Sequence, residues 1–223
     1  MRILKQLLSV VALCSVALGA AASPAAPISG VEYQTLQTAQ PTDTGKKIEV
    51  IEFFAYYCPH CNNLEPQLEA WVKKQGDNIV FKRVHVPRDE SVLPQQKLFF
   101  TLEAMGLLPQ YHKKVFNAMH AERNRLNRDE QVFDWVAANG IDRQKFIDTY
   151  RSFGVQAKVK RADGMMDSYK IDSWPTLIVD GRFQASPHLA ASGMQGNPSE
   201  TELQTAALQV MDFLVAKAKA EKK

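Results

Sequence analysis

Cysteine is scarce in this chain of 223 residues, which has only three: Cys14, Cys58 and Cys61. A small secreted domain that depends on disulfides for its stability has many cysteines, usually far apart in sequence. Only two residues separate Cys58 from Cys61, so a bond between them closes almost no chain and constrains the unfolded state little. The pair therefore indicates redox chemistry or metal binding, not structural crosslinking.

The chain also lacks a basic stripe. It has 27 Lys and Arg residues against 24 Asp and Glu, a net charge of +3, and the two signs are mixed along the sequence. We therefore expect no nucleic-acid partner. The one long apolar run, from residue 7 to about 18, is shorter than the roughly 20 residues of a membrane-spanning helix.

That apolar run belongs to a pattern typical of an export signal. Arg2 and Lys5 precede it, and small residues that fit cleavage before Ser23 follow it. We expect residues 1–22 to be a signal peptide that is removed together with Cys14. The mature chain would then keep a single pair of cysteines.

The first part of the mature sequence reads as strand, helix, strand. Residues 48–57 are β-branched and aromatic, as in a buried strand. A helix opens at Cys58 and ends at Gly76, with a kink expected at Pro66, and residues 79–86 form a second strand. Such a unit implies a right-handed parallel crossover. We also expect an edge strand near Tyr33.

Helical periodicity then continues for about 80 residues. Helices are expected at 95–105, 110–123, 129–139, 143–153 and 155–169. Strands at 176–179 and 182–185 flank the turn Asp180-Gly181, a strong hairpin signal. A last helix would start with Asn197 as its cap, Pro198 at its first position and Glu200 at its third, and run to about residue 219.

This order predicts an α/β protein with a thioredoxin fold (βαβ…ββα) and an all-helical insertion subdomain. We expect residues 23–87 and 155–223 to form the thioredoxin-like domain and 88–154 the helical insertion. Chain length allows this, since 223 residues suit one domain that carries an insertion.

The motif Cys58-Pro59-His60-Cys61 is placed where redox chemistry is favoured. Cys58 would cap a helix N-terminus, where free N–H groups and the macrodipole stabilise a thiolate. Pro59 fixes the first turn of the helix at a position where a backbone N–H would have no partner in the helix. His60 adds an N–H or a positive charge beside the sulfur. Cys61, one turn later on the face of Leu64, would be buried and would act as the resolving thiol.

Metal binding is the alternative that uses the same residues. Cys58, His60 and Cys61 are three possible soft ligands. The chain has no second Cys-x-x-Cys or His pair, and its other histidines are scattered through the sequence. We therefore expect no metal and no cofactor other than the Cys58–Cys61 disulfide.

Glu52 falls among apolar residues of the strand that leads into the motif. A carboxylate in such a row is costly to bury when charged, and its pKa should be raised. Two interpretations remain open for it. Glu52 either reaches water at the end of the strand or accepts the proton of Cys61.

The run from Glu52 to Cys61, together with the segment from Pro175 to Phe183, resembles the DsbA family of periplasmic disulfide oxidases. The resemblance covers essentially the whole mature chain. It implies that Cys58 is attacked, that Cys61 resolves, and that Pro175 is cis and lies against the pair. Trp174 and Tyr57 would border the substrate groove, although the family commonly has a small or β-branched residue at the position of Trp174.

The resemblance also implies partners and a location. The substrates would be unfolded or newly exported proteins with cysteines, and a quinone-linked membrane protein similar to DsbB would reoxidise the pair. We expect a monomer in the periplasm. A reductase or isomerase on the same fold remains an alternative, as do a soft-metal-binding module and a peptide-binding chaperone that uses Tyr56, Tyr57 and Trp174.

Overall fold

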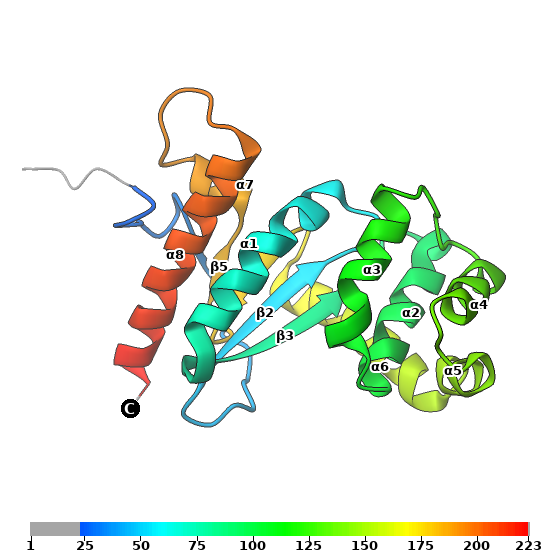
Figure 1. The fold of residues 1–223 in the computed structure, drawn as a ribbon. Coiled ribbons are helices and arrows are strands. Elements are labelled where there is room, and N and C mark those ends of the chain that lie inside the picture. Colours follow the sequence, from blue (N-terminus) through cyan, green and yellow to red (C-terminus); the bar gives the residue numbers. More distant parts are fainter. Residues whose placement is uncertain (1–22, 223) are drawn as a thin grey trace, which may run out of the picture.

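Five strands form one mixed sheet in the computed structural model, which describes residues 23–222 (Figure 1). The strands lie in the order β1-β5-β4-β2-β3. β2 is parallel to β3 and antiparallel to β4, while β5 is antiparallel to both β4 and β1. Their bounds are β1 Gln34–Thr35, β2 Ile48–Phe54, β3 Ile79–His85, β4 Thr176–Val179 and β5 Phe183–Ala185.

Helices cover both faces of this sheet. One face carries α1 and α8, which lie side by side, and the other faces the helical insertion and α6 (Figure 1). The helices are α1 Pro59–Gln75, α2 Leu93–Ala104, α3 Leu108–His120, α4 Asp129–Ala138, α5 Arg143–Tyr150, α6 Phe153–Tyr169, α7 Pro187–Ala191 and α8 Glu200–Glu221, with short 3₁₀ turns at Gly76–Asn78 and Glu90–Val92.

β2 is buried along its whole length because it has apolar layers on both sides. Val50 packs with α1 and α8 in one core cluster, and Phe53 and Phe54 belong to the cluster that continues into the insertion. A strand buried on both faces reads as a continuous apolar run, as the sequence does here. The end of this rigid strand leads directly to Cys58.

The predicted α/β thioredoxin-type order is confirmed, and most predicted elements lie within three residues of the observed ones. The strand near Tyr33 is present as β1. Pro66 lies inside α1 without ending it. One predicted boundary differs because Ser152 accepts a hydrogen bond from the Val155 N–H and caps α6, so α5 ends earlier, at Tyr150.

The predicted start of the last helix is wrong. Ser199, not Asn197, is the N-cap, and Glu200 is the first helical residue. The Ser199 hydroxyl accepts from the Glu202 N–H while the Glu202 carboxylate accepts from the Ser199 N–H, a reciprocal capping box. α7 was not predicted at all, because five residues are too few for a periodic pattern.

The predicted signal peptide, residues 1–22, lies outside the described residues. The predicted boundary between the insertion and the thioredoxin-like domain falls near the start of α6, which packs on α2 and also, through Tyr169, on Phe53 of the sheet. Within residues 23–222, none of the helices is both long and apolar enough to cross a membrane.

Candidate active site

Cys58 and Cys61 lie where β2 passes into α1. Cys58 has extended backbone angles and is the N-cap of α1, and Pro59 is the first helical residue. The backbone N–H of Cys61 donates a hydrogen bond to the Cys58 sulfur at 3.3 Å. Both cysteines are free thiols in this structure. Cys58 keeps 5% of its surface exposed and Cys61 none, so only Cys58 can be reached from solvent.

The two thiols have opposite acidities. Hydrogen bonds from Cys61 and from the backbone of His60, with the His60 charge, lower the pKa of Cys58 to about 7, although its burial acts in the other direction. Burial raises the pKa of Cys61 well above its ordinary value, and the neighbouring Cys58 and the charge of Glu52 add to that effect. A thiolate therefore forms first on Cys58, as the helix position predicts.

The loop before β4 covers the Cys58 sulfur. The Trp174–Pro175 peptide bond is cis, as expected from the family resemblance. The Cys58 thiol donates to the Trp174 carbonyl oxygen at 3.6 Å, so the backbone of this loop is in contact with the more exposed sulfur. The rings of Trp174 and Tyr57 meet edge to face, with centroids 6.1 Å apart.

A groove of about 310 Å³ adjoins the motif. His60 and the loop Ser173–Pro175 form one part of it, and the start of α7 and the first turn of α8 form the rest. Most of the surface exposed in the groove is apolar, although several of its residues are polar. Tyr57 is not among the lining residues, so it contacts Trp174 from outside the groove. The residues that line it are His60, Ser173, Trp174, Pro175, Ser186, Pro187, His188, Glu200, Leu203 and Gln204.

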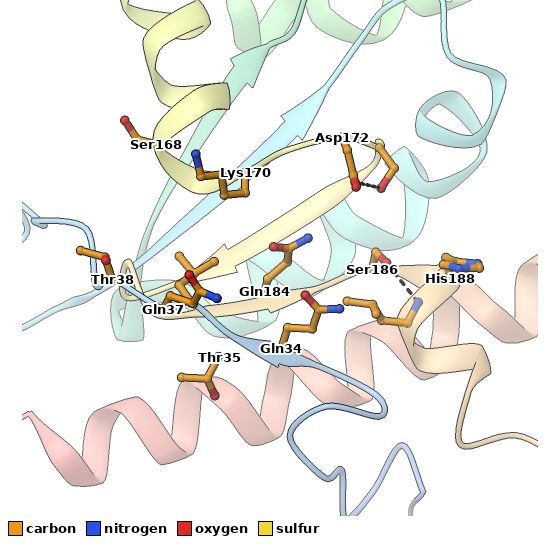
Figure 2. Close-up of a pocket in the computed structure, with 13 residues that line it drawn as sticks. Gln34, Thr35, Gln37, Thr38, Ser168, Lys170, Asp172, Gln184, Ser186 and His188 are labelled. Carbon is orange, nitrogen blue, oxygen red and sulfur yellow. Dashed lines mark hydrogen bonds between the residues drawn. The ribbon is translucent and has the colours of Figure 1, made fainter.

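A larger cavity of about 660 Å³ adjoins this groove (Figure 2). The two share Ser173, Ser186 and His188. Figure 2 shows mostly uncharged polar side chains around the larger cavity, including Gln34 from the edge strand β1 and Gln184 from the adjacent β5, together with Lys170 and Asp172. Neither cysteine lines it. The cavity is thus a polar extension of the groove and not a second centre of thiol chemistry.

Glu52 is fully buried on β2, which excludes the interpretation that it reaches water. It has a partner that the sequence analysis missed: Arg83, which lies opposite it on β3. The Arg83 Nε donates to Glu52 Oε2 at 2.8 Å, and its Nη2 donates to Glu65 Oε1 of α1, also at 2.8 Å. Burial raises the pKa of Glu52 to about 7, against the opposing effect of Arg83.

Three histidines that are scattered in sequence meet around Tyr56. The Tyr56 N–H donates to His85 Nε2 at 3.0 Å, and the Tyr56 carbonyl oxygen lies 2.8 Å from His120 Nε2. The Tyr56 hydroxyl lies 2.9 Å from His112 Nδ1. The N–H, the carbonyl oxygen and the hydroxyl of Tyr56 therefore all have hydrogen-bond partners. These contacts fix the backbone two residues before Cys58. Among the described residues, no group of three or more His, Cys, Asp or Glu side chains is arranged to hold a metal ion.

His60 projects from α1 towards the start of α8. Its Nδ1 lies 2.7 Å from Glu200 Oε1, and the other oxygen, Oε2, accepts from the Asn63 amide at 2.9 Å. The hydrogen bond with Glu200 raises the pKa of His60. Glu200 is a contact that sequence analysis missed, since 140 residues separate the pair.

Comparison with known proteins places this geometry in a family. Residues 49–206 match the family model described as a DSBA-like thioredoxin domain. The thiol:disulfide interchange protein DsbA of Burkholderia cepacia is 40% identical over 204 residues, which are 91% of each chain. The same-named protein of Bordetella pertussis is 38% identical over 210 residues, 93% of this chain and 95% of that one.

The chain belongs to the DsbA-like thioredoxin family. The crystal structure of Pseudomonas aeruginosa DsbA superposes with a TM-score of 0.78 at 30% identity, covering 87% of this chain and 95% of that chain. The family resemblance and the thioredoxin-type fold are confirmed. As a member of this family the protein is a disulfide oxidoreductase, and Cys58 and Cys61 are its one pair of neighbouring thiols among the described residues.

Proposed function

We propose that this protein donates the Cys58–Cys61 disulfide to newly exported proteins in the periplasm. The single observation that carries the proposal is the asymmetry of the pair: Cys58 caps a helix, keeps a small accessible surface and has a lowered pKa, while Cys61 is completely buried and has a raised pKa. A stable thiolate on Cys58 favours the reduced form of the protein. The Cys58–Cys61 disulfide is therefore readily reduced by client thiols, which makes it a good oxidant.

The exchange takes place in two steps. A client thiolate attacks the Cys58 sulfur, the Cys58–Cys61 bond breaks, and Cys61 leaves and takes up a proton. A second client thiolate then attacks the client sulfur of the mixed disulfide and releases Cys58 as a thiolate. Two electrons pass from the client to the protein, and the client keeps the new disulfide.

Glu52 is the proposed proton partner of Cys61. A group with a pKa of about 7 can give a proton to the leaving Cys61 thiolate and take it back when Cys61 attacks during reoxidation. Glu52 Oε1 has no hydrogen-bond partner among the described residues and is free for this exchange. Arg83 holds the other oxygen.

The groove beside Trp174 and Pro175 is the proposed client site. An extended client segment that brings its cysteine to Cys58 lies against the Trp174 backbone and the apolar groove lining. A chain that leaves the groove past His188 meets the polar cavity of Figure 2, where amide and hydroxyl groups suit an unfolded polypeptide backbone. The Tyr57 ring packs edge to face against the Trp174 ring and supports it.

Reoxidation and location complete the proposal. A quinone-linked membrane protein similar to DsbB returns the reduced pair to the disulfide, and the signal peptide directs the chain to the periplasm before it is removed. The protein acts as a monomer, with the thioredoxin-like domain in 23–87 and 155–223 and the insertion in 88–154.

A client-oxidation assay tests this function. The oxidised protein is mixed with one equivalent of a reduced, unfolded protein that has two cysteines, and both partners are quenched with an alkylating agent. We expect loss of two client thiols for every disulfide reduced in this protein. A protein that instead reduces the disulfide of insulin, and leaves client thiols unchanged, would be a reductase.

A further inference from the structure

The seam between α1 and α8 carries a series of polar contacts, and one end of it is at the active site. Glu200 of α8 meets His60 and Asn63 of α1. Gln204 then meets Gln67, and Asp212 accepts from Trp71, Lys74 and Gln75. The first contact differs from the others because His60 lies between the two cysteines. A change on α8 can therefore act on the thiols.

We propose that Glu200 is a positioning residue for the dithiol, and that it holds the His60 imidazolium where its charge stabilises the Cys58 thiolate. Two oxygens anchor the arrangement: Oε1 pairs with His60 Nδ1, and Oε2 is held by Asn63, so the carboxylate is fixed from two sides. The inference rests on the proposed role of Cys58 as the attacked thiol.

The electrostatics of the neighbourhood decide the sign of the effect. The groups that face His60 are the Cys58 sulfur on its own turn, Glu200 on α8, and His188 on α7 across the groove. The hydrogen bond to Glu200 raises the pKa of His60, while the charge of His60 lowers that of Cys58. Glu200 thus acts on Cys58 through His60, because the hydrogen bond favours the protonated imidazole.

The expected effect is modest because the pair is at the surface. The His60 and Glu200 side chains are 69% and 40% exposed, and solvent weakens ion pairs that are so exposed. Glu200→Gln keeps the shape, the capping box at Ser199 and the contacts of Asp212. We therefore expect a folded variant whose disulfide is about threefold less oxidising near pH 7.5.

The test is the equilibrium of the protein with glutathione at pH 7.5 and pH 5.5. Glu200→Gln should lower the equilibrium constant for glutathione oxidation about threefold at pH 7.5 and leave it unchanged at pH 5.5, where His60 is protonated without help. Asp212→Asn is the matched control, because it removes a carboxylate from the same seam far from His60. Asp212→Asn should leave the equilibrium constant unchanged at both pH values.

A double-mutant cycle shows whether Glu200 acts through His60. In the His60→Asn background, Glu200→Gln should have no effect on the equilibrium at pH 7.5. A direct field of Glu200 on the sulfur has the opposite sign, so a more oxidising Glu200→Gln protein at both pH values would overturn the inference. Equal constants for Glu200→Gln and wild type at pH 7.5 would also overturn it.

A separate measurement keeps this inference distinct from the proposed function. If the wild-type protein itself fails to oxidise reduced clients, the proposed function fails, whatever Glu200 does. If the wild type oxidises clients and NMR titration of the oxidised protein gives His60 the same pKa with and without Glu200, only the inference about Glu200 is wrong.

Discussion

The Cys58 sulfur lies 3.6 Å from the carbonyl oxygen of Trp174. The sulfur that a client would attack is therefore in direct contact with the loop that would hold the client. Cys61, three residues later, is fully buried. Cys58 therefore keeps a small accessible surface beside this loop, while Cys61 has none. The first predictions concern the consequences of that difference.

Replacing Cys58 and replacing Cys61 should block different steps of the exchange. With clients that already contain a disulfide, Cys61→Ser should accumulate mixed disulfides. The Cys58 thiolate attacks the client disulfide and releases one client thiolate, and no buried thiol remains to displace the client from Cys58. Cys58→Ser should abolish exchange. Mass spectrometry of acid-quenched mixtures detects the adducts. Faster alkylation of Cys61 than of Cys58 in the reduced wild-type protein would show that the roles are reversed.

The stability of the reduced protein should depend on pH through the same pair. Cys58 has a folded pKa of about 7, below that of a free thiol, so its contribution appears as pH rises through 7 and is lost at lower pH. Cys61 has a raised pKa and destabilises the fold above the unfolded value of about 8.5. The sum should peak near pH 8 to 8.5 at about 1 kcal/mol.

Urea unfolding of the reduced wild type and of Cys58→Ser between pH 6 and 10 measures the contribution of Cys58, because the other titrating groups cancel in the difference. Cys61 titrates in both proteins and cancels as well, so we expect the difference in unfolding free energy to rise from pH 6 to about pH 8.5 and then to level off towards pH 10. A difference that stays constant over the whole range would mean that the Cys58 pKa is the same in the folded and unfolded chain.

Trp174 should determine client preference more than redox potential. Its indole lines the groove and offers a large apolar surface, but it contributes only a backbone carbonyl to Cys58. Trp174→Val should change kcat/KM for peptide clients by up to about tenfold, the effect of roughly 1.4 kcal/mol of contact. A potential shift above about 30 mV with unchanged client kinetics would contradict this assignment.

Glu52→Gln should slow the release of mixed disulfides in which Cys61 is the attacking thiol. The amide keeps the shape but cannot accept the proton, so the rate should fall most above pH 7, where the Glu52 carboxyl of the wild type, with its pKa of about 7, is ionised. Attack on Cys58 should be nearly unchanged. The fold should become more stable, because an amide is cheaper to bury than a charge and Arg83 keeps Glu65 as a partner.

Glu49→Gln is the control for this variant. Glu49 is a second buried carboxylate of β2, and it accepts from Lys82 of β3 at 2.7 Å. It lies at the far end of the strand from the cysteines. Single-turnover resolution rates should respond to Glu52→Gln alone. Identical pH–rate profiles for both variants and wild type would leave Glu52 with a structural role.

Local sequence signals predicted much of the fold and the centre of the site. The apolar run of β2, the helix start at Cys58 and the turn at Asp180-Gly181 are all encoded by neighbouring residues, and the structure has each of them. The burial of Cys61 followed from its helical position. The cis form of the Trp174–Pro175 bond was predicted only from the family resemblance, because few X–Pro bonds in folded proteins are cis.

The contacts that were missed are between elements far apart in sequence. Glu52 and Arg83 are opposite each other in the parallel register of β2 and β3, and an alignment of the two strands from Ile48 and Ile79 would have paired them. No such signal exists for His60 and Glu200. Their contact depends on how α8 packs against α1, which periodicity does not specify.

The equilibrium with glutathione tests the central claim most directly. The oxidised and reduced proteins are separated after equilibration in defined mixtures of reduced and oxidised glutathione at pH 7. A thiolate stabilised on Cys58 predicts a reduction potential more positive than about −200 mV, in the range of proteins that donate disulfides. A potential near the −270 mV or so of thioredoxin would contradict the account and assign the pair to reduction.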